Sequence, residues 1–184
     1  MGVIYMKILN FGSLNIDYVY SVDHFVQKGE TISSSQMNIF SGGKGLNQST
    51  ALGRAGAQVF HAGRIGKGGE FLVEQLKEAG VNTDLVVLDS QCSTGHAIIQ
   101  NDAEGDNCIL LYGGANQRIT KEQIDATLDQ FDAGDYLVLQ NETSNLPYLM
   151  EKAAEKQMKI VLNPSPMDEK IKALPLDKVT LFFV

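Results

Sequence analysis

The sequence predicts an α/β protein whose parallel sheet carries helices on both faces in three layers. Short apolar runs alternate along the chain with amphipathic segments, and this order is typical of strand and helix alternation. Two hairpin-like segments interrupt the alternation, and their mixed polar and apolar patterning favours a small antiparallel sheet with one wet face. We therefore expect one main sheet with right-handed crossovers and a subsidiary sheet beside it.

Each strand expected in the main sheet is short and mostly apolar. The runs lie at residues 7–12, 58–62, 136–140, 159–162 and 179–184. The last run is continuously apolar, as in a parallel strand buried on both faces. Because the sequence stops on this run, we expect the first part of a longer fold, incomplete at its C-terminus.

Four segments between these strands have helical periodicity. The first begins at the glycine cluster 41–45 and ends near Gly56, and the second covers 70–79. The third starts at Thr120, and the fourth covers 145–157. Thr120 is a typical N-cap, and Ile124, Leu128 and Phe131 follow it on one apolar face. Gly56 is a plausible C-cap because glycine adopts the left-handed conformation without steric cost.

The hairpin-like segments are expected to form a lid or an oligomer contact. The first contains strands at 18–22 and 31–40 around a turn with Gly29. The second contains strands at 94–100 and 108–112, joined by the polar turn 101–107.

The stretch SGGKGLNQ at 41–48 is the strongest candidate for a ligand site. Its three glycines allow close approach to a ligand, and the following helix is expected to direct free N–H groups and its positive dipole end there. Lys44 adds a cation and Asn47 a donor and an acceptor, which suits a polyhydroxylated or anionic small molecule. A Walker A loop is excluded, because Gly45 follows the lysine. The alternative is a glycine-rich turn before an ordinary helix.

Asn15 and Asp17 follow the first strand, at the edge of a parallel sheet where ligands bind. If the backbone there is extended, residues two apart project to one face and can grip neighbouring hydroxyls of one ligand. The alternative is a turn in which either side chain caps its own backbone.

Composition limits the possible partners. The 184 residues are 43% hydrophobic and 20% charged, with a net charge of −7, and no basic face for nucleic acid is visible. No run is long enough to span a membrane, and residues 1–6 are too short for a signal peptide, so we expect a cytoplasmic protein. Cys92 and Cys108 are expected to be reduced. The single histidines at 24, 61 and 96 receive no role.

These features together resemble the ribokinase-like family of sugar kinases, also called the PfkB family. The family signature corresponds to GGKGLNQS at 42–49, followed by Gly56 and Gly66. Further matches are GSLNID at 12–17, GET at 29–31, GGAN at 113–116, QNE at 140–142 and NPSP at 163–166. The resemblance covers essentially the whole chain, residues 1–184, as the N-terminal part of the family's domain, with lid strands inserted at about 18–40 and 94–112.

The resemblance implies ATP-dependent phosphorylation of a small sugar, with ribose favoured and fructose and nucleosides handled by relatives. It implies sugar contacts from Asn15, Asp17, Gly42, Gly43, Lys44, Asn47 and Glu142. Carboxylates at 17 and 142 would accept hydrogen bonds from sugar hydroxyls. For Glu142 taken alone, the alternative is a surface acid at a helix start.

The family's nucleotide half is expected beyond Val184. ATP and Mg²⁺ are implied by the family, but their residues are largely missing here, as is the Gly-Ala-Gly-Asp motif that supplies the catalytic aspartate. We therefore expect no catalytic residue and no metal site in these residues, and little activity of this chain alone. The alternative is a non-catalytic sugar-binding or dimerisation module, with two lids clasped in a homodimer.

Two further points bear on these expectations. Where the family often has an acidic residue after Gly66, the chain has KGG at 67–69, so the helix at 70–79 is expected to lack its side-chain cap. A dinucleotide-dependent oxidoreductase also fits the α/β order, but no G-x-G-x-x-G follows the first strand.

Overall fold

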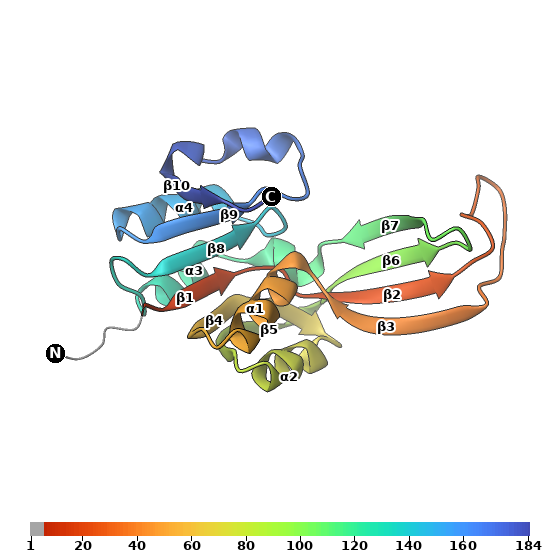
Figure 1. Cartoon of the computed structure of the whole chain (residues 1–184), viewed down its shortest axis with the longest axis horizontal. Helices are drawn as coiled ribbons and strands as arrows, with labels where there is room; N and C mark the ends of the chain where they lie inside the picture. Colours follow the sequence, from red (N-terminus) through yellow and green to blue (C-terminus); the bar gives the residue numbers. More distant parts are fainter. Residues whose placement is uncertain (1–5) are drawn as a thin grey trace.

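A computed structural model describes residues 6–184 and contains two sheets joined side by side (Figure 1). The main sheet has the order β10-β9-β8-β1-β4-β5, and all its pairs are parallel. Its strands are β1 (Ile8–Phe11), β4 (Val59–Lys67), β5 (Asn82–Ser93), β8 (Tyr136–Gln140), β9 (Lys159–Asn163) and β10 (Val179–Phe182). The expectation that residues 1–6 form no leader concerns residues that lie almost wholly outside the described part.

Helices cover both faces of the main sheet, as predicted. They are α1 (Lys44–Arg54), α2 (Glu70–Glu78), α3 (Lys121–Leu128) and α4 (Leu146–Glu155), with 3₁₀ helices η1 (Gly114–Arg118), η2 (Glu169–Ala173) and η3 (Leu176–Lys178). Helices α1 and α2 pack over one face, and α3 and α4 over the other (Figure 1). Thr120 caps α3 by accepting a hydrogen bond from Gln123 N at 3.2 Å.

Alternation along β4 divides the core into two clusters. Val59 and Ile65 face α1 and α2 in a cluster with Leu46, Leu72 and Leu76. Ala62 faces the other way, into the larger cluster. That cluster joins β1, β8 and β9 to α3 and α4 through Leu9, Phe11, Leu137, Leu139, Ile124, Leu128, Leu149, Met150, Ile160 and Leu162. A strand covered on both faces holds its position firmly, which fixes the strand ends that lead to the site.

The second sheet, which we call the lid, has the order β3-β2-β6-β7 and extends away from the main sheet (Figure 1). It contains β2 (Asn15–Ser21), β3 (Gln36–Gly42), β6 (Gly95–Asn101) and β7 (Asn107–Tyr112). The pairs β2–β3 and β6–β7 are antiparallel, as expected. A parallel pair, β2–β6, joins them, so the sheet as a whole is mixed.

The clearest differences from the sequence-based expectations concern three strands. Strand β5 was not predicted, because it is an edge strand with a mixed polar pattern and only one partner, β4. The strand expected at 31–40 begins only at Gln36. Strand β10 was expected to be fully buried, but it lies at the sheet edge, and Leu181 and Phe182 are 56% and 49% exposed.

Glycines also lie at the ends of two helices, after α1 and before α2. Gly56 has a φ of +83° after α1, as its predicted C-cap role requires. Helix α2 begins after Gly69 without a side-chain cap, which confirms the expectation from the KGG stretch. Within residues 6–184, no helix is long and apolar enough to cross a membrane.

Candidate functional site

The site lies where the chain passes from the main sheet into the lid. Strand β1 ends at Phe11, and β2 starts at Asn15 as the first residue of the lid. Asn15 and Asp17 are both in extended backbone, opposite Gly95 and Ala97 of β6. The two side chains therefore share one face of β2, and the alternative of a self-capping turn is excluded.

A cavity of about 210 Å³ opens at this junction. Its polar lining consists of Asn15, Asp17, Gly43, Lys44, Asn47 and Glu142, and its apolar lining of Ala97, Ile99, Ile109 and Leu111. The apolar side chains all come from β6 and β7 of the lid. The structure thus brings together every site residue predicted from the sequence except Gly42, although nothing in it tests their role.

Gly42 does not line this cavity itself but contacts Asp17, which does. A Cβ atom added to Gly42 would lie 2.1 Å from Oδ2 of Asp17, so any larger residue here would displace the Asp17 carboxylate. Glycine at this position therefore leaves the room in which the Asp17 carboxylate lies.

A second cavity of about 310 Å³ adjoins the first and shares Asn15, Leu111 and Glu142 with it. Its remaining lining comes from Gly113, Asn116, Gln117, Asn141, Pro166, Asp168 and Lys170. The cleft is therefore larger than the space beside the lid wall, and Glu142 stands between its two parts.

Glu142 makes the densest set of contacts in the site. Its Oε2 accepts hydrogen bonds from Lys44 N at 3.0 Å and from Ser13 Oγ, and its Oε1 accepts one from Lys44 Nζ at 3.0 Å. The carboxylate is only 6% exposed, whereas the Lys44 side chain is 40% exposed. A buried carboxylate with several donors is held rigidly, so one end of the cavity is preorganised.

These contacts correct one expectation about the glycine cluster. The first amides of α1 were expected to be free for a ligand, but Glu142 accepts the hydrogen bond of Lys44 N. Ser13 accepts those of Gly45 N, through Oγ at 3.1 Å, and of Leu46 N, through its carbonyl at 2.9 Å. Protein groups therefore satisfy the helix start, and a carboxylate already stands at its positive end.

Nucleotide phosphates do not fit this helix start for the same reason. A phosphate would have to displace the Glu142 carboxylate, and like charges repel it. In the described part of the chain, no group of three or more His, Cys, Asp or Glu side chains is placed to hold a metal ion.

The glycines of the cluster permit close packing of α1 on the β1–β2 connection. A Cβ on Gly45 would lie 2.4 Å from Ser13 N, and Gly43 has a φ of +94°. Neither position accepts another residue without a shift of backbone. The cluster is therefore a packing device that places Lys44 and Asn47 beside the cavity.

The electrostatic environment of Asp17 is unusual for a carboxylate. Burial raises its pKa, the nearby Glu142 carboxylate raises it further, and Lys44 opposes both by lowering it. The charged form is thus costly in the empty cavity, and a ligand hydroxyl that donates a hydrogen bond would offset that cost.

Asn116 is a site residue to which the sequence assigned no role. It lies on η1, is 1% exposed, and donates from Nδ2 to Asn15 Oδ1 at 2.8 Å. The GGAN stretch was a family match, but the contact spans more than a hundred positions of sequence, and no local pattern reports such a contact.

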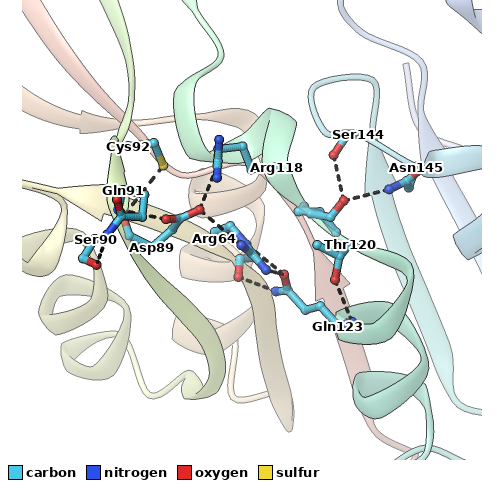
Figure 2. Close-up of polar contacts among 12 residues, drawn as sticks. Arg64, Asp89, Ser90, Gln91, Cys92, Arg118, Thr120, Gln123, Ser144 and Asn145 are labelled. Carbon is cyan, nitrogen blue, oxygen red and sulfur yellow. Dashed lines mark hydrogen bonds and ion pairs between the residues drawn. The ribbon is translucent and has the colours of Figure 1, made fainter.

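A polar cluster fixes η1 against the main sheet (Figure 2). Asp89 of β5 accepts hydrogen bonds from Arg118 Nε of η1 at 2.8 Å and from Arg64 Nη1 of β4 at 3.3 Å. The hydrogen bond from Arg118, followed by those from Gln91 N and Arg64, lowers the pKa of Asp89 to about 2. Arg64 also donates to Gln123 of α3, at 2.9 Å from Nη2, so the cluster joins β4, β5, η1 and α3.

His61, Cys92 and Cys108 do not line either of the two cavities. His61 is buried, its pKa is lowered to about 4 by that burial, and its Nδ1 lies 2.7 Å from Ser49 Oγ. Cys92 and Cys108 are free thiols, as expected.

Fold and cavity together define a class: α/β proteins of the ribokinase fold, with a parallel sheet, a β lid and a polar cavity between them. The chain belongs to the pfkB family of carbohydrate kinases, which it matches over residues 6–184. The sequence-based assignment to this family is confirmed.

Relatives and solved structures agree with this assignment. The chain is 34% identical over 181 residues to the ribokinase of Staphylococcus aureus (strain COL), covering 95% of this chain and 58% of the relative. It is 35% identical over 159 residues to the ribokinase of Haemophilus influenzae, covering 84% and 52%. A crystal structure of ribokinase from Cryptococcus neoformans var. grubii in complex with ADP superimposes with a TM-score of 0.80 at 34% identity, covering 96% of this chain and 56% of that one. The chain thus spans little more than half the length of these proteins.

Proposed function

We propose that the cavity binds a small sugar, with ribose favoured, as the sugar-binding part of an ATP-dependent carbohydrate kinase. The main support for this proposal is that polar residues from separate parts of the sequence line one cavity. They are Asn15, Asp17, Gly43, Lys44, Asn47 and Glu142. Family membership and the ribokinase relatives support the same proposal.

The chemistry of the cavity suits a ligand with several hydroxyls. Asp17 offers an acceptor, and Asn47 offers both a donor and an acceptor. The lid side chains Ile99 and Leu111 supply an apolar wall for the carbon face of a ring. The part of the cleft beside the lid wall has a volume of about 210 Å³, which suits a molecule smaller than the drug-sized ligands that fill about 300 Å³ or more.

Titration calorimetry of this chain tests the proposal. We expect D-ribose to bind more tightly than D-fructose or adenosine, and Asp17→Ala to weaken ribose binding at least about tenfold, since a buried polar contact is lost. Asp106→Ala is the matched control, because Asp106 is an exposed acid in the β6–β7 turn. A folded wild-type chain that binds none of the three ligands would overturn the proposal, and preference for fructose would overturn the choice of ribose.

We also propose that this chain turns over no sugar alone. Phosphoryl transfer requires cations or N–H groups around the transferred phosphate. The N–H groups at the start of α1 already donate to Glu142 and Ser13. A coupled assay of ADP release with ribose, ATP and Mg²⁺ is expected to stay at the background rate, and turnover in the usual kinase range of about 1 to 100 s⁻¹ would contradict this.

A second candidate function is a non-catalytic sugar-binding or dimerisation module, with two lids clasped in a homodimer. The observation that favours it is an exposed apolar face of the lid, opposite to the cavity: Ile39 of β3 and Leu110 and Tyr112 of β7 are 53%, 68% and 54% exposed. Strands β3 and β7 are also the two edges of the lid, with unpaired backbone groups. Ribose binding without turnover, together with dimers in solution, would support this candidate.

A further inference from the structure

The side-chain amide of Asn116 pairs with the backbone of the β1–β2 connection in the way that the backbone of an adjacent strand would. Its Oδ1 accepts a hydrogen bond from Leu14 N at 3.0 Å, and its Nδ2 donates to Leu14 O at 3.2 Å. The same Nδ2 donates to Asn15 Oδ1 at 2.8 Å. One buried amide therefore engages both backbone groups of one residue and the side chain of the next.

These contacts determine which end of each amide is oxygen and which is nitrogen. A backbone N–H can only donate, so the Asn116 atom that faces Leu14 N is oxygen and its other end is NH₂. An NH₂ group donates, so the Asn15 atom that it meets is oxygen. The NH₂ group of Asn15 is then turned away from η1, and it makes no hydrogen bond to any of residues 6–184.

The surroundings hold this arrangement in place. A Cβ atom on Gly95 would lie 2.3 Å from Asn116 Nδ2 and 2.4 Å from Asn15 Oδ1, so the amide pair is enclosed on the lid side. The backbone oxygen of Asn116 accepts a hydrogen bond from Ser144 N at 3.1 Å. The ion pair of Arg118 with Asp89 ties the end of η1 to β5.

We propose that Asn116 is a positioning residue that makes Asn15 a hydrogen-bond donor toward the ligand. This inference rests on the proposed function only for the nature of that ligand, a sugar. Because Asp17 on the same face of β2 is an acceptor when ionised, the cavity presents a donor and an acceptor two residues apart. A sugar then places an oxygen that accepts at Asn15 and a hydroxyl that donates at Asp17.

The substitution Asn116→Asp tests the proposal because it keeps size and shape. One oxygen of the new carboxylate still accepts from Leu14 N, but the other faces two acceptors, Asn15 Oδ1 and Leu14 O. We expect the Asn15 amide to rotate, to donate its NH₂ group to the carboxylate and to turn its oxygen to the cavity. Ribose affinity measured by calorimetry is expected to fall about tenfold or more, because one ligand hydrogen bond becomes a repulsive contact.

A measurement without ligand separates this inference from the proposed function. Solvent exchange of the side-chain NH₂ protons of Asn15, followed by NMR in labelled protein, should be fast in the wild type and slowed in Asn116→Asp. Fast exchange in both proteins, or slow exchange already in the wild type, would overturn the proposal whether or not ribose binds. If the wild type binds no ribose, the proposed function fails, and the exchange experiment still decides the role of Asn116.

Two more variants complete the design. Asn15→Asp keeps an oxygen for Asn116 Nδ2 and places the other oxygen toward the cavity, so it should lose ribose affinity to a similar extent even if Asn116→Asp does not fold. Ser144→Ala is the control, because it removes one hydrogen bond to Ile119 O in the same region without touching either amide. If Asn15→Asp binds ribose as tightly as the wild type does, the proposed donor role of Asn15 is contradicted.

Discussion

At the scale of single residues, Glu142 is the group that organises the cavity. It follows β8, yet its carboxylate lies at the start of α1, where it accepts from both the backbone and the side chain of Lys44. Its negative charge stands at the positive end of the helix, so it stabilises α1 as well as lining the cavity. Binding and stability are therefore coupled in this one side chain.

We predict that Glu142→Gln destabilises the protein. A neutral amide has one accepting oxygen instead of two, so one of the Lys44 donors loses its partner, at a cost of about 1 to 3 kcal/mol. Urea unfolding at neutral pH measures the effect. Glu155→Gln, at a side chain 62% exposed in its pair with Lys152, serves as the control and should change stability by less than about 0.5 kcal/mol. Equal effects of the two substitutions would contradict the capping role.

We predict that Asp17→Asn makes the protein more stable at neutral pH while weakening ligand binding. Burial and Glu142 raise the folded-state pKa of Asp17, so its ionisation opposes folding above the pKa of the unfolded chain. The gain from the substitution should shrink as the pH falls and the wild-type carboxyl takes up its proton. Thermal unfolding of both proteins between about pH 7 and pH 4 checks this, and a variant that is less stable at pH 7 would contradict it.

At the scale of elements, η1 is the short segment that determines how the lid meets the sheet. It carries Asn116 at the cavity and Arg118 at the polar cluster with Asp89 and Arg64 (Figure 2). A 3₁₀ segment of five residues has little hydrogen bonding of its own, so these contacts fix its place. A substitution in this cluster is therefore expected to shift η1 and, through Asn116, the side chain of Asn15.

We predict that Asp89→Asn destabilises the protein in a pH-dependent manner. The folded-state pKa of Asp89 is about 2, below the ordinary value of 3.8 for an aspartate, so its ion pairs stabilise the fold above about pH 4. This contribution is lost as the pH falls from about 4 through about 2. Urea midpoints of wild type and variant should differ most near pH 6 and converge toward pH 2, and a constant difference would contradict the prediction.

Much of the site could be predicted from the sequence because its residues lie in short local patterns. Asn15 and Asp17 follow a clear strand, and the glycine cluster opens a clear helix, so their position at the sheet edge follows from periodicity. Glu142 needed the family resemblance, since its local sequence indicates only a surface acid. The capping of α1 by Glu142, the role of Asn116 and the edge strand β5 depend on contacts between distant segments, which no local pattern reports.

At the scale of the whole molecule, two sheets with separate tasks are joined where the chain crosses between them: from β1 to β2, from β3 to α1, from β5 to β6 and from β7 to η1. The main sheet has a two-sided core, whereas the lid exposes apolar side chains along β3 and β7. Ile39 of β3 and Leu110 of β7, which share one face of the lid, are 53% and 68% exposed. Exposed apolar side chains gathered on one sheet favour a partner surface there, in line with the proposed lid homodimer.

We predict that Leu110→Lys shifts a dimer of this chain toward the monomer. A charge placed in an apolar contact has to be desolvated, so the dissociation constant should rise at least about tenfold. Sedimentation velocity over a concentration series measures it. Lys77→Leu tests whether any surface change has this effect, because Lys77 lies on α2, away from the lid. Monomers at all concentrations of the wild type would refute the lid dimer.

The polar and the apolar lining of the cavity come from different parts of the chain, so substitutions can change one without the other. In the proposed sugar site, the groups that would contact hydroxyls lie at the junction and on α1, while Ala97, Ile99, Ile109 and Leu111 form a wall carried only by β6 and β7. Enlarging or trimming that wall alters the shape of the accepted ring and leaves the hydrogen-bonding groups in place. The sugar preference that we propose could therefore be changed by substitutions in a single hairpin, without disturbing the core that folds the protein.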